Sequence, residues 1–435
     1  MKVFECADVK RSLLLVWWGS LALIGYAQPR WLTRLDSVGL QPFVMTQLWG
    51  TYTQGQAVWQ PDSGRYAPVD DRADLQLRRA RLGFRGQPYA RLRYTLVLFY
   101  DLIGRDLLSG TVGGSNGPAP NLGIWDAFFQ WQMMPRSEAL HLTAGYFRPQ
   151  LGRESITSAW SVNSLEKATS QTYLRRHLVG TGPGRATGLN IGGLLRGPEW
   201  LGLTYNLGMF LPQYTGGTPQ TVGAQFAPLW VGRAVLQLGD PEQTRYRIGY
   251  EINYFGQRKG LSLGLGGAWQ GRTELFAHSR ALSVDLLANY GPLNLDGEWA
   301  WLQRRDTRPL PTLVQRDFVY VSQTGHLRAG VNLPAGRYLL EPTFMVVAFR
   351  GGMDATAQAD AEAVHASAGR ETTYDAGINW YFDGKRLKLA LHYTWRNGEP
   401  GAAGDGAAVN AFFTQGGIGP IRRGNWWGLG VSAIF

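Results

Sequence analysis

The residues best placed to do chemistry are five arginines at odd-numbered positions of two neighbouring segments. In residues 74–86 and 90–103, arginines alternate with apolar side chains. Successive side chains of a β-strand point to opposite faces, so each segment would carry its arginines on one face. A guanidinium stays charged at any working pH and can donate two parallel hydrogen bonds to an oxyanion. The sequence therefore predicts a wall that binds anions, formed by Arg79, Arg81, Arg85, Arg91 and Arg93, with Arg148 two strands away.

Carboxylates in other segments leave a second interpretation open. They are Asp101, Asp126, Asp285, Asp296 and Glu298. The arginines could pair with these groups across a lumen and serve only as structural lining. We expect a net preference for anions, because charged rings in a channel with low-dielectric walls select ions. Strict specificity for phosphate is a narrower hypothesis.

The alternation of apolar and polar side chains also indicates which elements hold these arginines. The apolar residues Leu387, Leu389, Leu391, Tyr393 and Trp395 are separated by mostly polar or charged ones, and similar segments recur along the chain. A tilted strand needs about ten residues to span a membrane, whereas strands of soluble proteins usually have about five or six. The segments are of the longer kind, many end in Trp or Tyr, and short turns alternate with long polar loops, as in transmembrane barrels. The pattern favours a membrane barrel over a soluble sandwich.

Sixteen such segments predict an all-β fold, a 16-stranded antiparallel transmembrane β-barrel with long outer loops. They lie at 40–53, 74–86, 90–103, 122–133, 139–149, 185–196, 200–211, 228–239, 260–271, 279–290, 293–304, 317–333, 337–350, 372–383, 386–396 and 425–435. Residues 245–255 also look like a strand, but single-chain bacterial barrels have an even number of strands. We therefore assign residues 240–259 to a periplasmic excursion.

Composition and the N-terminus indicate the compartment. With 57 Gly, 17 Trp and only 17% charged residues, the chain is unlike a disordered protein or a coiled coil, and its one cysteine, Cys6, cannot form a disulfide framework. Basic residues precede an apolar run at 13–24, and Gly25 and Ala27 lie where a signal peptidase needs small residues. We expect residues 1–27 to be a cleaved signal peptide for Sec-type export, 28–39 a short periplasmic segment, and 40–435 a barrel in the outer membrane of a Gram-negative cell.

Several short motifs lie in order along the chain, at 78–86, 92–94, 126–129, 144–154, 166–168, 184–189, 231–233 and 340–344. In order and spacing they resemble the phosphate-selective porin O/P family, and most of all its Bacteroidetes-type outer-membrane porins. The chain departs from the pattern at Ala186, where we expect an acidic residue after Arg185. The resemblance implies a porin, usually a homotrimer, whose third outer loop folds inward to narrow the pore. Here that constriction loop is 150–184, and its charged residues include Arg153, Glu154, Lys167, Arg175 and Arg176.

Other chemistry has little support in the sequence. The six histidines lack the paired spacing of zinc sites, and there is no nucleophile elbow or phosphate-cradling glycine loop before a helix. We expect no enzyme activity, no cofactor and no bound metal. The expected partners are small anions such as phosphate, outer-membrane lipids and lipopolysaccharide, and the barrel-assembly machinery, which would recognise the C-terminal Phe435; nucleic acid is not expected, because the arginines alternate with an apolar face.

The predicted function is passive diffusion of small hydrophilic solutes through an outer-membrane porin that favours anions. One alternative is a non-conducting barrel that serves as a structural or docking subunit of a larger outer-membrane assembly. The long outer loops at 351–371 and 397–424 would then be binding surfaces, although neither is dense in the aromatic residues typical of interface hot spots.

Overall fold

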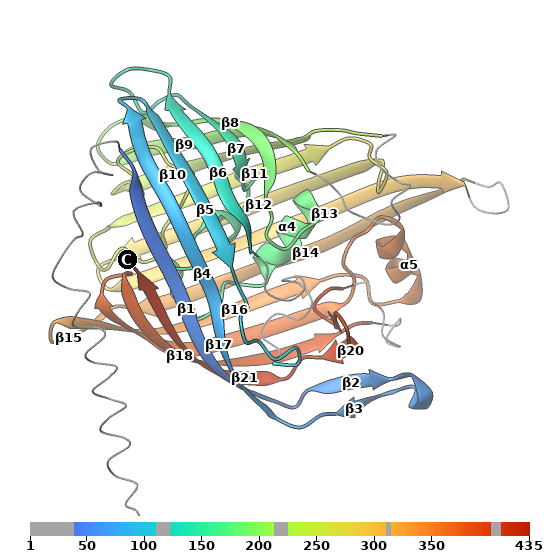
Figure 1. Cartoon of the computed structure of the whole chain (residues 1–435). Coiled ribbons are helices and arrows are strands. Elements are labelled where there is room, and N and C mark those ends of the chain that lie inside the picture. The colour runs from blue at the N-terminus through green and yellow to red at the C-terminus, as the bar shows by residue number, and fades with distance from the viewer. Residues whose placement is uncertain (1–38, 110–121, 213–224, 310–314, 402–409) are drawn as a thin grey trace, which may run out of the picture.

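The computed structural model describes residues 39–109, 122–212, 225–309, 315–401 and 410–435. Its main element is an antiparallel β-sheet closed into a barrel (Figure 1). The sixteen barrel strands are β1 (Gln41–Gln54), β4 (Arg72–Tyr89), β5 (Leu92–Tyr100), β6 (Leu122–Gln132), β7 (His141–Phe147), β8 (Ala186–Arg196), β9 (Leu201–Leu211), β10 (Leu229–Gly239), β11 (Gly260–Gln270), β12 (His278–Tyr290), β13 (Leu293–Pro309), β14 (Gln315–Val331), β16 (Tyr338–Arg350), β17 (Arg370–Asp383), β18 (Leu387–Glu399) and β21 (Asn425–Ile434). A short strand, β15 (Leu333–Ala335), continues along β16 after β14. The predicted fold class is confirmed.

The first and last strands close the ring. β1 pairs with β4 on one side and with β21 on the other. Val44 and Phe435 exchange backbone hydrogen bonds of 3.0 and 2.9 Å at this seam. The predicted signal peptide (1–27) and nearly all of the predicted periplasmic segment (28–39) lie outside the described residues.

The predicted facing is confirmed in the strand predicted at 386–396. In β18, Leu391 is 50% exposed on the outside of the barrel. Its neighbour His392 is buried inside, where its Nδ1 lies 2.7 Å from Asp375 Oδ1 of β17. Apolar side chains thus face outward and polar ones inward, as a barrel in lipid requires.

Residues 240–259 form no strand, which agrees with the even strand number, but they do not stay outside the barrel either. They follow β10 at the end of the barrel where most strands are joined by short turns, and they fold back into the lumen. There Tyr246, Tyr250 and Ile252 are almost fully buried. Tyr246 Oη accepts a 2.9 Å hydrogen bond from Asn190 Nδ2 of β8. Asn253 and Asn332 exchange side-chain hydrogen bonds of 2.7 and 3.0 Å. We call this segment the lumenal insert.

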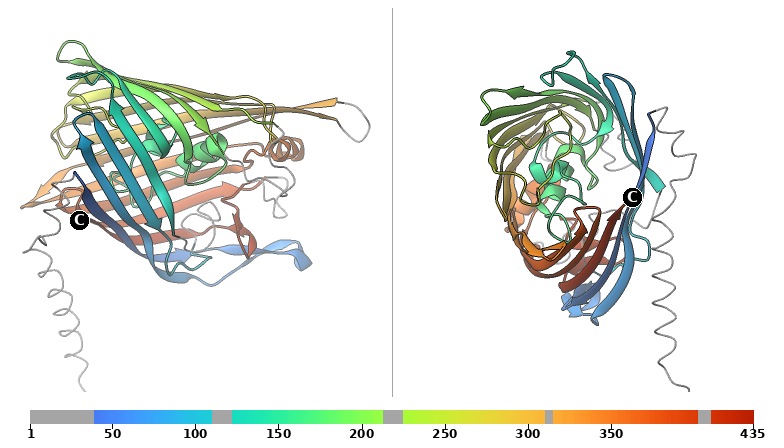
Figure 2. Two further views of the ribbon diagram at one scale, coloured as in Figure 1. Left: turned by 45° about the horizontal axis from the view of Figure 1, so that its top comes forward. Right: turned by 90° about the vertical axis from the view of Figure 1, so that its left-hand side faces the viewer.

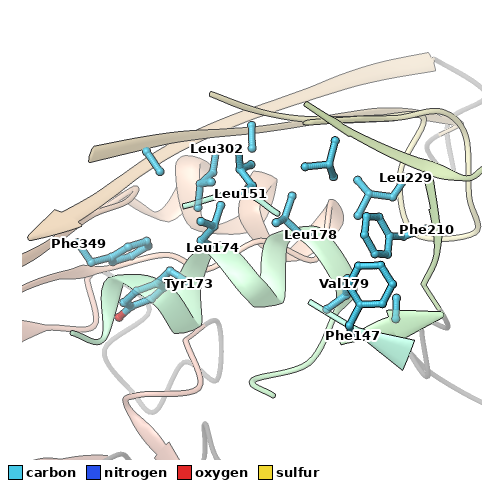
Figure 3. Close-up of a cluster of buried hydrophobic side chains, with 14 of the residues drawn as sticks. Phe147, Leu151, Tyr173, Leu174, Leu178, Val179, Phe210, Leu229, Leu302 and Phe349 are labelled. Carbon is cyan, nitrogen blue, oxygen red and sulfur yellow. The ribbon is translucent and has the colours of Figure 1, made fainter. Parts of the chain in front are cut away.

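The constriction loop, 150–184, enters the lumen from the opposite end and contains α3 (Arg153–Ile156) and α4 (Ser170–Val179). Figure 2 shows α4 inside the ring of strands. Its apolar side chains, among them Leu174 and Leu178, pack with inward-facing residues of the wall such as Phe210 and Leu302 (Figure 3). This cluster holds one side of the loop against the wall and leaves the other side facing the lumen.

The long loops add small elements at the end of the barrel from which the constriction loop enters. β2 (Ala57–Gln60), β3 (Arg65–Pro68), β19 (Thr414–Gln415) and β20 (Gly419–Arg422) form a four-stranded sheet beyond the rim, and a turn of 3-10 helix (Pro61–Ser63) links β2 to β3. Another loop carries α5 (Ala355–Ala363), which begins at the N-cap residue Asp354. None of the helices in the described ranges is long and apolar enough to cross a bilayer.

Candidate anion-binding site

A cavity of about 270 Å³ lies in the lumen between the constriction loop and the wall formed by β4, β5 and β6. Residues of β4 to β6 line one side, and the constriction loop lines the other. Ile248 and Gly249 of the lumenal insert complete the lining. The cavity therefore lies where the two inward-folded segments leave the lumen open beside this wall.

Positive charge predominates in the lining. The cationic side chains are Arg78, Arg79, Arg81, Arg148, Lys167, Arg175 and Arg185, and the carboxylates are Asp101, Asp126 and Glu166. Seven cations face three carboxylates, an excess of four positive charges. In a low-dielectric barrel such an excess attracts anions.

Three of the arginines are held by carboxylates. Glu166 accepts hydrogen bonds from both Arg78, at 2.6 Å, and Arg79, at 2.5 Å. Arg81 pairs with Asp101, with 3.0 Å between Arg81 Nε and Asp101 Oδ1. These pairs agree in part with the interpretation that arginines of the lumen are balanced by acids.

Trp125 separates Arg81 from a further cation, Arg185. The guanidinium carbons of Arg81 and Arg185 lie 3.4 and 3.6 Å from its ring centroid. Two guanidinium groups cannot share one face at these distances, so they lie on opposite faces of the ring. Arg185 also donates to Asp126, with 2.9 Å between Nε and Oδ1. The indole thus fixes both guanidinium planes while cation–π attraction stabilises them.

Arg148, Lys167 and Arg175 form no ion pair with any carboxylate of the described residues. Arg148 Nη1 and Lys167 Nζ both donate to the carbonyl oxygen of Thr157, at 3.3 and 2.6 Å. Arg175 donates to Ser155, with 3.1 Å between Nε and Oγ. Carbonyl and hydroxyl oxygens orient these cations but do not neutralise them, so their charge is available to an anion.

Burial and mutual repulsion shift the pKa values of these loop residues. Burial, followed by the charges of Arg175 and Arg148, holds the pKa of Lys167 well below its usual range. Burial and the nearby Arg185 lower the pKa of Arg175 to about 9. Burial alone would raise the pKa of Glu166, but Arg78 and Arg79 outweigh it and lower that pKa to about 2. A bound anion would relieve the repulsion among the cations.

Four predicted site residues lie elsewhere. Arg85 and Arg91 are exposed near the tight turn between β4 and β5, where Arg85 lies over the ring of Phe43. Arg93 is half-buried and donates to the carbonyl oxygen of Tyr246 in the lumenal insert, at 3.2 Å. Arg176 is on α4 but outside the cavity lining. The five arginines of the predicted wall are therefore divided, and only Arg79 and Arg81 reach the cavity.

Arg153 and Glu154 also do not line the cavity; they attach the constriction loop to the rest of the lumen. Arg153 donates to both oxygens of Glu242 in the lumenal insert, at 2.8 and 2.9 Å, and to Asp285 of β12, at 3.0 Å. Glu154 accepts a 2.8 Å hydrogen bond from Arg328 of β14. A backbone bridge between Thr157 and Tyr250 adds a second link between loop and insert.

Glu154, Asp296 and His326 place possible metal ligands within 4.8 Å of one another. Arg328 donates to both carboxylates, at 2.8 Å each. His326 Nε2 lies 2.9 Å from Asp296 Oδ2. The guanidinium already supplies the positive charge at this position, so the residues fit an ion-pair network better than a metal centre.

Two β-bulges explain which cavity residues the sequence analysis missed. The pairing of β1 with β4 shifts between Gln47 and Leu48 and leaves Arg78 as an extra residue in β4. The pairing of β5 with β6 likewise skips Trp125. An extra residue breaks the alternation of faces, so the pairs Arg78–Arg79 and Trp125–Asp126 both point inward. A strict period of two predicts that only one member of each pair faces the lumen.

Comparison with known proteins identifies the family. The family described as phosphate-selective porin O and P matches residues 59–317, more than half of the chain. The chain belongs to this family. It is therefore an outer-membrane channel protein of the porin type, and the resemblance seen in the sequence is confirmed.

Solved porin structures are similar to this porin in fold. OprB of Pseudomonas putida at high pH aligns with a TM-score of 0.56 and 11% identity, covering 93% of this chain and 96% of OprB. OmpF of Salmonella typhi in complex with daunomycin gives 0.53 and 13%, covering 92% and 99%. An anion-selective porin from Comamonas acidovorans gives 0.50 and 11%, covering 91% and 99%. No curated protein sequence matches the chain.

Proposed function

We propose that this porin lets small hydrophilic solutes diffuse across the outer membrane and favours anions, with phosphate the best fit among common inorganic ions. The observation that carries the proposal is the group formed by Arg148, Lys167 and Arg175, whose charges have no carboxylate partner within the described residues. Guanidinium groups bind tetrahedral oxyanions through paired hydrogen bonds, and an ammonium adds a point charge. The family's description and the anion-selective porin of similar fold support the same proposal.

The experiment is single-channel recording of the full-length protein in a planar bilayer under a KCl gradient, with phosphate then added. We expect an anion-favouring reversal potential and a chloride current that phosphate reduces. The variant Arg148→Gln/Lys167→Gln/Arg175→Gln should lose both properties. The matched control, Arg85→Gln/Arg91→Gln, removes two exposed arginines outside the cavity and should keep them.

Either of two results would contradict the proposal. Equal selectivity in the two variants would mean that the cavity cations do not set it. A folded, heat-modifiable barrel without conductance would support a structural or docking subunit instead.

Four further proposals accompany this function. Residues 1–27 act as a cleaved signal peptide, and residues 28–39 as a short periplasmic segment. The porin assembles as a homotrimer among outer-membrane lipids and lipopolysaccharide. The assembly machinery recognises Phe435, which lies exposed beside the seam of the barrel.

A further inference from the structure

The outer surface of the barrel carries a groove over β10 to β13. Gly232 of β10 and Gly267 of β11 are direct neighbours across the sheet, and both belong to the outward-facing rows. Their missing side chains leave a hollow of about 710 Å³, within the range of small-molecule sites, roughly 300–1,000 Å³. The walls are formed by large outward side chains, chiefly Leu207, Trp230, Trp269, Leu282 and Trp301.

The fold of the barrel does not require these two glycines. A Cβ built on Gly232 would come no closer than 4.0 Å to another heavy atom, and one on Gly267 no closer than 3.5 Å. By contrast, a Cβ on Gly266, which faces the lumen, would lie 2.6 Å from Leu151. The groove is therefore a feature of the outer surface that larger side chains could fill without disturbing the strands.

One end of the groove carries a cation. Arg280 of β12 faces outward, pairs in register with Trp269 and Gln303, and is exposed. It takes part in no ion pair with the described residues, whereas the other outward arginine nearby, Arg305, lies 3.0 Å from Asp317. The flanking Trp230 and Trp269 lie at the ends of their strands, where aromatic residues mark the membrane interface.

We propose that this groove binds one acyl chain of lipid A, the phosphorylated lipid of the outer leaflet, with a phosphate on Arg280. Apolar walls lined with tryptophan suit a hydrocarbon chain, and an unpaired arginine at the level of the interfacial aromatic residues is placed to bind a phosphate of the outer leaflet. A lipid phosphate lies at the level of the interfacial aromatic residues. A protein partner would have to bring a carboxylate to the same depth, so charge complementarity favours the lipid.

The test is native mass spectrometry of the full-length porin, released from detergent micelles after titration with lipid A or with dephosphorylated lipid A. The wild type should retain lipid A preferentially. Arg280→Gln should weaken retention of lipid A roughly tenfold, as expected for the loss of one charge-assisted contact, and should abolish the preference for the phosphorylated form. Gly232→Leu and Gly267→Leu should weaken retention of both lipids by filling the groove.

Two matched controls lie on the same outer surface. Ala234→Leu adds the same side chain at an outward position of β10 outside the groove lining, and Arg305→Gln removes an outward arginine that is already paired. Both should bind lipid A like the wild type, and heat-modifiable migration on gels confirms that each variant is folded. Unchanged retention in Arg280→Gln or in both leucine variants would overturn the proposal. So would a loss of subunit association, rather than of lipid, in the Gly267→Leu protein.

Discussion

The link between the constriction loop and the lumenal insert leads to a specific prediction for Arg153→Met. Arg153 is fully buried and bridges Glu242 of the insert to Asp285 of β12. Methionine keeps much of the apolar stem but removes the charge. Asp285 would still have Arg233, at 2.8 Å, whereas Glu242 would lose its ion-pair partner.

The size of the effect follows from the burial of this network. Breaking one partner of a buried ion pair costs about 3–5 kcal/mol, because an uncompensated charge remains. If this cost falls on the attachment of the loop, the detached fraction rises more than about 100-fold. In Arg153→Met/Glu242→Gln no charge is left uncompensated. The detached fraction of the loop in this double variant should therefore be closer to the wild-type value than in Arg153→Met.

Single-channel recording measures this effect directly. We expect Arg153→Met to show larger or noisier open-channel currents and Arg153→Met/Glu242→Gln to recover steady ones. A folded Arg153→Met barrel with wild-type conductance and noise would refute the reasoning, because the loop would then be held without this link. A double variant worse than the single one would refute the charge argument in particular.

Three other predictions concern the cavity and the constriction loop. Burial and neighbouring cations lower the pKa of Lys167, so Lys167 should lose its proton, and the channel part of its anion selectivity, at a lower pH than the pKa of an exposed lysine. Bound phosphate should shift this loss of selectivity to higher pH. If Lys167→Gln had the same pH profile as the wild type, the prediction would be wrong. Trp125→Leu should lower the free energy of unfolding by about 1–2 kcal/mol and weaken the block of the chloride current by phosphate, because two guanidinium groups lose the ring between them. An unaltered block would show that the ring does not position these groups. Gly152→Ala should increase channel noise, because its Cβ would lie 2.4 Å from Leu174 at a φ of +73°, whereas Gly291→Ala, at +55° with open space around it, should not; equal noise would argue against the packing explanation.

The fold could be predicted largely from the sequence because the period of two is a local property. Lipid on one side and polar lumen on the other act on every strand, so segments such as 386–396 show their facing without any knowledge of their neighbours. The even strand number then excluded residues 245–255 as a strand, and the structure agrees.

The site was less predictable because it depends on contacts between distant parts of the chain. The bulges at Arg78 and Trp125 come from the register between strands. They move the outward apolar row from odd to even positions in β4 and from even to odd positions in β6, a change of phase that a strict period of two overlooks. The acid that holds Arg185 is Asp126, 59 positions earlier, rather than a residue beside it in the chain. The burial of Tyr246 in the lumen likewise depends on partners in β8 and β9, so residues 240–259 could be recognised as an excursion but not as an insert.

The reversal potential of the wild-type channel in a KCl gradient shows whether the pore favours anions. The excess of positive charge in the cavity predicts a sign that corresponds to greater permeability for chloride than for potassium. A reversal potential of the opposite sign would mean that the carboxylates of the lumen dominate the conducting path and that the pore favours cations.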